Sequence, residues 1–343
     1  MSGTGGQTPT VDWSSRRVLF VTVEPGAAAY LVPLWRRWLG AGSPEWRVLA
    51  TPAARRMIEE QTLPGLPLLS APDDGVDFGP EIFPNDWRPE ALFISASGAV
   101  LEQQTCAYGL REARPVFQFV DAPYNYQERF CRDDKTQLPD RILVIDKRCV
   151  AEAADAGLPA QRILPVGHPA WETVRPLPPA DAGRVMYVDQ PVERLYGGRL
   201  GYTEHTCWAL VKEAAVSRPD LFAELSYRPH PLQPQGVPAH SNGMRCVADA
   251  AEGLYTAGTV LGMFASTMTD ALLAGRHVVS IQPCTVGWDM CALSRHGMIA
   301  RVGTVGALIE ALEQPWHSDA SALAESLRDS CGRIESVLAE ALS

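Results

Sequence analysis

The feature of this 343-residue sequence that most constrains its fold is a strand-and-helix alternation that occurs twice. Short apolar runs alternate with helix-like segments from Arg17–Val23 onward, a proline-rich stretch at 175–183 interrupts the series, and the alternation restarts at Val185–Val188. Continuous apolar runs are typical of parallel strands covered on both faces. The sequence therefore predicts an α/β protein with two doubly wound, Rossmann-like domains. The expected strands are 17–23, 46–50, 91–95, 116–120, 141–145, 185–188, 225–228, 244–248, 259–264 and 277–281.

The linker gives the expected domain organisation. Residues 1–15 are polar and are predicted to be disordered, and 16–174 are predicted to form the N-terminal domain. Residues 175–184 form the linker, because proline-rich composition is typical of a domain boundary. Residues 185–343 form the C-terminal domain, whose terminal helix can pack back on the N-terminal one. We expect a ligand-binding cleft between the two domains.

Composition narrows the class of protein. Hydrophobic residues make up 46% and charged residues 20%, as in soluble globular proteins. The net charge is −10 and no basic run is present, which argues against a nucleic-acid partner. No apolar stretch reaches the roughly 20 residues of a membrane-spanning helix, and the N-terminus has no signal-peptide core, so we expect a cytoplasmic protein. The eight cysteines include no Cys-x-x-Cys pair, which favours reduced thiols over disulfides or zinc.

Two segments of the C-terminal half carry polar groups at predicted strand ends. Ser266 and Thr267 follow the strand 259–264 and begin a helix, where hydroxyls, amides and the helix dipole accept a phosphate. The alternative is that Ser266 only caps the helix. Arg228 ends the predicted strand 225–228 and His230 follows it, and both can donate to phosphate oxygens. The alternative for His230 is a solvent-facing side chain in a turn. Ligands of open α/β sheets bind at the carboxyl ends of the strands, which favours the binding interpretation.

These motifs resemble those of GT-B glycosyltransferases. The segment Leu261–Ile281 is similar to their donor-binding region, although His277 stands where the family usually has proline. Arg-Pro-His-Pro at 228–231 resembles the motif of bacterial sialyl- and Kdo-type transferases, which use CMP-sugars. Val-Gly-His-Pro at 166–169 and Asp-Gln-Pro at 189–191 resemble segments of the UDP-GlcNAc 2-epimerase-like superfamily. The resemblance implies Asp270 on the donor's ribose, Gln190 near its phosphates, and Gly167 and His168 at the cleft or hinge.

Three acidic residues compete for the role of catalytic base. Asp121 follows a buried strand and ranks first, because epimerase relatives have an acidic residue at a comparable place. Glu24 follows the first strand and resembles the early glutamate of Kdo-transferase-like enzymes. Asp74 lies in an Asp-Asp-Gly stretch similar to that of bacterial sialyltransferases, but earlier in the chain than that family places it. A solvated or capping carboxylate is the alternative for each.

The resemblance predicts transfer of a sugar from a CMP- or UDP-linked donor to an unknown acceptor, with inversion. No DxD motif is present, so neither a metal nor a cofactor is expected. One alternative is a UDP-GlcNAc 2-epimerase-like isomerase, although the Asp-Ser-Gly-Gly turn and paired glutamates of that family are replaced by Ala265–Asp270. Another is a non-catalytic protein that binds sugar nucleotides. Oligomerisation is left open by the sequence.

Overall fold

The computed structural model describes residues 16–40, 45–71, 78–79, 82–84, 87–230, 245–314 and 320–342, except for the side chain of Ser70. The predicted disordered segment 1–15 and the candidate base Asp74 lie outside the described residues. The chain divides into two compact units, Met1–Thr173 with Glu325–Ser343 (unit 1) and Val174–Ala324 (unit 2). No helix among the described residues is long and apolar enough to cross a membrane.

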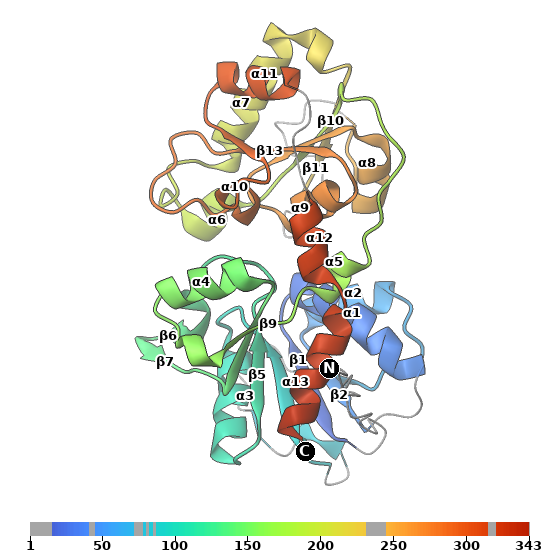
Figure 1. Ribbon diagram of the computed structural model, residues 1–343, viewed down its shortest axis with the longest axis vertical. Helices are drawn as coiled ribbons and strands as arrows, with labels where there is room; N and C mark the ends of the chain where they lie inside the picture. Colours follow the sequence, from blue (N-terminus) through green and yellow to red (C-terminus); the bar gives the residue numbers. More distant parts are fainter. Residues whose placement is uncertain are drawn as a thin grey trace, which may run out of the picture. The chain divides into compact units, whose positions relative to one another are not determined.

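Unit 1 is built on a seven-stranded sheet in the order β3-β2-β1-β4-β5-β8-β9, with every neighbouring pair parallel (Figure 1). Its strands are β1 (Val18–Thr22), β2 (Arg47–Ala50), β3 (Leu68–Ser70), β4 (Ala91–Ser95), β5 (Val116–Phe119), β8 (Arg141–Val144) and β9 (Ile163–Pro165), and β6 (Cys131–Arg132) and β7 (Lys135–Thr136) form a separate antiparallel pair. Its helices are α1 (Pro25–Gly40), α2 (Pro52–Glu60), α3 (Val100–Arg111), α4 (Lys147–Asp155), α5 (Pro169–Glu172) and α13 (Ser330–Ala341), with short 3₁₀ helices η4 (Glu128–Phe130) and η5 (Ala160–Arg162).

The apolar runs of unit 1 become strands because both sheet faces are covered. Every residue of β1 and β4 is buried. On one face the ring of Phe20 lies 5.3–6.0 Å from those of Trp35, Trp38 and Trp46 in edge-on contacts. Burial of each such aromatic side chain contributes several kcal/mol of transfer free energy, roughly 25 cal/mol per Å² of apolar surface.

The C-terminal helix α13 completes that face of unit 1. Ile334 and Leu338 are fully buried in the same core cluster as Phe20. Glu335 accepts a hydrogen bond of 2.9 Å from the indole N–H of Trp38, so the helix is also held by a polar contact. Residues about 300 positions apart in the chain therefore share one core.

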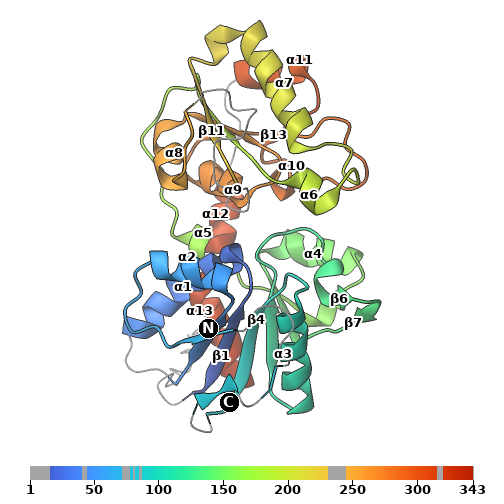
Figure 2. The ribbon, with the colours of Figure 1, turned by 180° about the vertical axis from the view of Figure 1, so that it is seen from behind.

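Unit 2 has a five-stranded sheet in the order β11-β10-β12-β13-β14, again with parallel neighbours (Figure 2). Its strands are β10 (Arg184–Val188), β11 (Glu224–Arg228), β12 (Thr259–Gly262), β13 (His277–Ile281) and β14 (Ala300–Val302). Its helices are α6 (Val192–Tyr196), α7 (Glu204–Ser217), η6 (Pro219–Leu221), α8 (Ala250–Thr256), α9 (Ser266–Leu273), α10 (Ala292–Arg295) and α11 (Val305–Glu313); α12 (Ser321–Leu327) spans the boundary between the units.

The chain before β10 is fixed to unit 2 by Arg276. This side chain is 1% exposed, and its guanidinium donates to the carbonyls of Pro178 (2.7 Å) and Leu254 (2.9 Å). Leu177 adds a backbone hydrogen bond to Ala274. The proline-rich stretch is therefore held along the first part of its length. Of the expected strand at 244–248, residue 244 lies outside the described residues, and 245–248 form an isolated bridge between Tyr227 and Cys246 in place of a strand.

Candidate functional site

The polar residues of unit 1 gather at the carboxyl ends of its central strands. Strand order reverses at β1, whose neighbours are β2 and β4, and this switch point is where open α/β sheets bind ligands. Glu24 follows β1 and precedes α1, and Asp121 follows β5. A β-carbon added to Gly26, in the first turn of α1, would lie 3.5 Å from Oδ2 of Asp121. Two of the three sequence-predicted bases are therefore neighbours in one cluster.

Arg129 organises this cluster. It lies on η4, its side chain is only 9% exposed, and its Nη1 is 3.2 Å from Oδ1 of Asp121. Its guanidinium also donates to the carbonyl oxygens of Ala96 (2.5 Å), Ala122 (3.1 Å) and Tyr124 (2.9 Å). A buried guanidinium needs such partners because desolvation of an unpaired charge is costly. Arg129 thus ties the loop after β4 to the loop after β5 and fixes one oxygen of Asp121.

Glu24 has a different environment from Asp121. No hydrogen bond or ion pair to its carboxyl is found among the described residues, and its side chain keeps an exposed surface. Desolvation by the surrounding protein raises the pKa of Glu24, the negative charge of Asp121 raises it further, and Arg129 opposes both effects. The shift favours a carboxyl that gains and loses a proton closer to neutral pH.

A third carboxyl, Glu102, serves the loop that follows β4. It is 1% exposed and accepts hydrogen bonds from the backbone N–H groups of Ser97 (2.7 Å), Gly98 (2.9 Å) and Ala99 (3.1 Å). The hydroxyl of Ser95 also donates to it. Glu102 therefore occupies the N-terminus of α3 in the manner of a capping residue, and those N–H groups are not available to a ligand.

Gly167 and His168 hold structural positions in unit 1. Gly167 has φ +85°, and an added β-carbon would lie 2.1 Å from Oγ of Ser330. His168 is 5% exposed, stacks on Trp171 with the ring centroids 3.9 Å apart, and accepts a hydrogen bond from the Trp171 N–H at Nδ1. Burial lowers the pKa of His168 to about 3, so the imidazole is neutral at physiological pH. Their predicted position at a cleft or hinge stays a prediction.

In unit 2, Gln190 connects the ends of two neighbouring strands. It follows β10, is 9% exposed, and its Oε1 accepts the backbone N–H of Phe264, after β12, at 2.8 Å. Strand order reverses at β10, so this contact lies at the switch point of the second sheet. The fully buried Asp189 accepts the N–H of Gln190 (3.0 Å) and the hydroxyl of Tyr227, which fixes the backbone beside Gln190.

Arg228, His230 and Asp270 form an electrostatic group at the same sheet edge. Arg228 ends β11 and donates to the carbonyl of Ala248 at 2.7 Å. Desolvation raises the pKa of Asp270 to about 6, against the opposing charge of Arg228. The pKa of His230 is lowered by desolvation and then by Arg228. The group combines a cation, a histidine that is neutral near pH 7 and a carboxyl that titrates just below it.

Ser266 and Thr267 are the first two residues of α9. The N-cap is Ala265, which has no side chain to accept a hydrogen bond, so Ser266 is not the capping residue. Ser266 is exposed, Thr267 is 8% exposed, and the first turn contains no acidic residue. The first N–H groups of a helix have no partner within it, and a helix N-terminus favours anions.

No family model matches the chain, and no curated protein matches it. Solved structures do. A glycotransferase of kitacinnamycin aligns with a TM-score of 0.59 at 16% identity, over 94% of this chain and 98% of that one. UDP-GlcNAc 2-epimerase from Neisseria meningitidis, bound to UDP-GlcNAc, gives 0.64 at 9% identity, over 94% and 100%. Anabaena HepE, in complex with UDP and glucose, gives 0.63 at 11% identity, over 96% and 100%.

The chain has the GT-B-type fold of these enzymes. Sequence identities of 9–16% show a shared fold and do not show a shared activity, which depends on the side chains at the site. The predicted α/β class with two Rossmann-like domains is confirmed. The roles assigned to individual residues stay predictions.

Sequence reasoning missed two residues of this GT-B fold that shape the sites. One is Arg129, because nothing in the sequence signals that a guanidinium eight residues after Asp121 is buried against it. The other is Asp189, which belongs to the Asp-Gln-Pro motif but has no role that the resemblance implies. Its position directly after a buried strand, next to Gln190, was the available signal.

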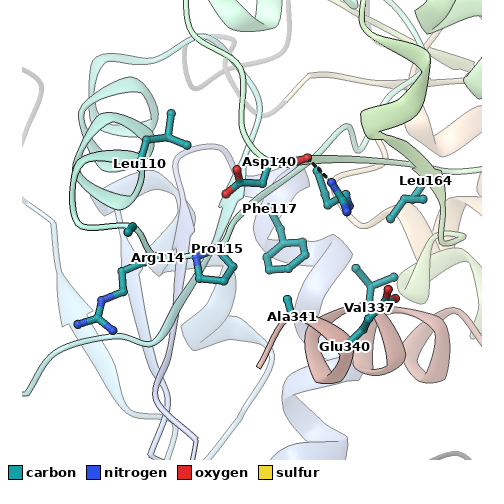
Figure 3. A pocket seen from close by; sticks show the side chains of 11 residues that line it. Leu110, Arg114, Pro115, Phe117, Asp140, Leu164, Val337, Glu340 and Ala341 are labelled. Carbon is teal, nitrogen blue, oxygen red and sulfur yellow. Dashed lines mark hydrogen bonds between the residues drawn. The ribbon is translucent and has the colours of Figure 1, made fainter. Parts of the chain in front are cut away.

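A cavity of about 500 Å³ lies at the opposite, amino edge of the unit 1 sheet. Figure 3 shows Phe117 between the end of α3, which carries Leu110, and α13, which carries Val337 and Ala341. Its polar lining includes Asp140, whose carboxylate accepts the N–H of Val116 at 2.9 Å. None of the sequence-predicted site residues lines this cavity.

One group among the described residues has the donor atoms for a metal ion. The ligand atoms of Glu193, Glu204 and His205 lie within 4.8 Å of one another on α6 and α7. Glu204 already accepts the N–H of Glu193 at 2.8 Å, and His205 pairs with the Glu193 carboxylate at 3.5 Å. The three residues therefore form a local polar network through these contacts.

Proposed function

We propose that the protein is an inverting glycosyltransferase that uses a pyrimidine-nucleotide sugar, linked to UDP or CMP. The observation that carries the proposal is the group of Arg228, His230 and Asp270 at the carboxyl edge of the unit 2 sheet. The uncapped N-terminus of α9 begins at that same edge. A cation, a histidine and a helix start are suited to a diphosphate or phosphodiester, and a carboxylate is suited to ribose hydroxyls.

In this proposal unit 2 binds the nucleotide and stabilises it as the leaving group. Arg228 and His230 donate to phosphate oxygens, and Ser266 and Thr267 offer hydroxyl and backbone N–H groups. The side-chain amide of Gln190 is held through its oxygen, which directs its N–H groups away from Phe264. Asp270 accepts from the ribose. Arg228 places a positive charge beside the departing phosphate, and the proposed step uses no metal or cofactor.

Unit 1 supplies the proton acceptor. The acceptor hydroxyl must lose its proton as it attacks the sugar, and a carboxyl with a pKa nearer neutrality is the more efficient base. We assign that role to Glu24, whose carboxyl is not bonded to another described side chain. Asp121, whose carboxylate pairs with Arg129 at 3.2 Å, lies beside it and contributes to its raised pKa. In this pair Glu24 takes the proton, and Asp121 helps to set the pKa of Glu24.

Two other functions are compatible with the fold. A UDP-GlcNAc 2-epimerase-like isomerase is favoured by the Neisseria meningitidis enzyme, which aligns at a TM-score of 0.64. An isomerase would convert UDP-GlcNAc without any acceptor. A non-catalytic sugar-nucleotide-binding protein would bind nucleotide and turn over nothing. Product analysis with and without acceptors separates all three functions.

Thermal-shift measurement with CMP, UDP, GDP and TDP is the first test. A nucleotide present at one hundred times its dissociation constant adds about 2.7 kcal/mol to the free energy of unfolding. We expect UDP or CMP to raise the Tm and GDP to leave it unchanged. A Tm that none of the four nucleotides moves would contradict the proposal.

A further inference from the structure

Half of the exposed large hydrophobic side chains among the described residues lie on two joined segments of unit 2. Six large hydrophobic side chains are exposed in the described part of the chain, and three of them are Leu195 (50%), Val286 (60%) and Trp288 (45%). The other three, Leu110, Val216 and Tyr255, lie on separate helices. Single exposed apolar residues need no explanation, but a group of them marks an interaction surface.

The three residues come from two segments that lie together. Leu195 is on α6, and Val286 and Trp288 are in the loop between β13 and α10. The N–H of Val286 donates to the carbonyl of Leu200 at 2.9 Å, which joins the loop to the segment after α6. Figures 1 and 2 show α6 and α10 side by side from opposite directions. We call the surface formed by Leu195, Val286 and Trp288 the apolar platform.

Trp288 is held in place by the residues around it. The guanidinium carbon of Arg295 lies 3.7 Å from the centre of its ring, so one face of the indole is covered by a cation. Arg295 donates to the carbonyl of Asp289 at 2.6 Å, and the Asp289 carboxylate accepts from Gln282 and Ser294, both at 2.6 Å. An exposed aromatic ring that is already ordered loses little conformational entropy when it binds a ligand.

The apolar platform adjoins the proposed donor site. Gln282 directly follows β13, so the loop begins at the carboxyl edge of the unit 2 sheet. Tyr196, next to Leu195, packs edge-on against Phe264 with the ring centroids 5.9 Å apart. The N–H of Phe264 is the one that Gln190 accepts. A ligand on the platform therefore lies within a few side chains of the proposed phosphate-binding residues.

The charges near the platform favour an anion. Its two segments carry three arginines, Arg194, Arg199 and Arg295, in a chain whose net charge is −10. Arg194 and Arg199 are exposed. The two carboxylates of these segments are Glu193 and Asp289, and the Asp289 side chain is 11% exposed and saturated with hydrogen bonds. A local excess of exposed guanidinium groups attracts and stacks on flat anionic groups.

We propose that the apolar platform recognises the acceptor, and that the acceptor carries a planar aromatic group with an acidic substituent. The aromatic group packs on Trp288, with Val286 and Leu195 beside it, and the acid meets Arg199 or Arg194. This inference rests on the proposed function only in naming the bound molecule an acceptor. The affinity of the surface for an aromatic acid is independent of nucleotide binding.

The test uses 8-anilinonaphthalene-1-sulfonate, a fluorescent aromatic acid, with N-phenyl-1-naphthylamine as its uncharged counterpart. We expect Trp288→Ala to weaken binding of the sulfonate about tenfold, because an aromatic contact and its buried area are lost together. Arg199→Gln should weaken binding of the sulfonate a few-fold and leave the uncharged dye unaffected. Trp288→Ala should bind UDP and CMP as the wild type does.

Two control variants decide where the dye binds. Tyr255→Ala removes an exposed aromatic side chain from α8, and Leu110→Ala alters the cavity of Figure 3. Both should bind the sulfonate as the wild type does. The proposal is overturned if Trp288→Ala keeps wild-type affinity, or if either control loses as much. If wild-type protein binds neither UDP nor CMP while Trp288→Ala still loses the dye, the platform stands and the proposed function fails.

Discussion

The carboxyl edges of the two sheets carry opposite chemistry on similar frames. In unit 1 the carboxyls of Glu24 and Asp121 occupy the edge, and the cation beside them, Arg129, is buried and donates four hydrogen bonds. In unit 2 a cation and a histidine, Arg228 and His230, occupy the edge beside the carboxyl of Asp270, and desolvation shifts the pKa of all three groups. In unit 1 the buried Arg129 opposes the rise in the pKa of Glu24, and in unit 2 Arg228 opposes the rise in the pKa of Asp270. Parallel topology thus fixes where ligands bind, and the side chains decide which charges are presented.

The largest expected effect comes from removing the proton acceptor in unit 1. Glu24→Gln keeps the shape of the side chain but cannot take a proton, so kcat should fall roughly 10²–10⁴-fold. Affinity for UDP or CMP, measured by calorimetry, should not change, because those contacts belong to unit 2. Glu128→Gln, an exposed glutamate on η4, is the matched control and should retain activity.

The pH profile separates the two carboxyls. Activity that needs ionised Glu24 is lost as the pH falls through its raised pKa. Because Asp121 raises that pKa, Asp121→Asn should lower it and move the acid limb of the kcat profile to lower pH. The assignment of Glu24 as the base is contradicted if Asp121→Asn abolishes transfer while Glu24→Gln stays active. Asp121 is then the base, as the sequence alone ranked it.

In unit 2, loss of His230 should weaken nucleotide binding. A hydrogen bond to a charged group contributes about 1.5–3 kcal/mol, so His230→Ala should raise the dissociation constant of UDP or CMP about 10–100-fold. The pKa of His230 in the protein without nucleotide is lowered, so a phosphate that binds the protonated form of His230 should bind more tightly as the pH falls. His205→Ala, an exposed histidine of the same unit, is the control. If the His230→Ala variant is unfolded instead, His230 has a structural role in the core of unit 2.

A substitution at Gly167 tests how unit 1 is closed by its terminal helix. Gly167→Ala places a methyl group against Ser330 and Arg333 at a residue with φ +85°, and should lower stability by about 1–3 kcal/mol. Gly157→Ala has a similar φ of +93° with nothing within 4 Å, so it measures the backbone cost alone. Thermal unfolding should show a clearly larger loss for Gly167→Ala. Equal losses would mean that the contact with α13 contributes nothing.

The smallest effect is a gain in stability at Asp270. Its folded-state pKa of about 6 lies above its usual value of 3.8, so ionisation costs stability as the pH rises through 6, and the cost is absent below about pH 4. Asp270→Asn should therefore raise the Tm by about 2–4 °C at pH 8, equivalent to about 1 kcal/mol, and leave it unchanged at pH 4. The same variant should bind UDP or CMP less tightly. A pH-independent change in Tm would contradict the assigned cause.

Part of the candidate site could be predicted because it depends on strand ends. Ser266 and Asp121 follow apolar runs that the sequence marks clearly, and Arg228 ends the predicted strand 225–228. The structure ends strands at or shortly before these residues. The sequence could not show that Glu24 and Asp121 are neighbours, because only the pairing of β1 with β4 and of β4 with β5 brings them together. The capping role considered for Ser266 failed by one residue, because helix ends depend on local backbone geometry.

The sequence by itself determined that this protein has two parallel α/β sheets, because continuous β-branched and apolar runs can be buried only between layers of helices. It also determined which polar residues stand at the strand ends. Tertiary structure alone decided that Arg129 is buried against Asp121, that α13 joins the core of unit 1, and that the segment after α6 is joined to the loop of Trp288. Each of these contacts joins residues that are far apart in the chain or buries a side chain that the hydrophobic pattern does not mark as buried. The pKa values of the site residues depend on that burial and on the neighbouring charges.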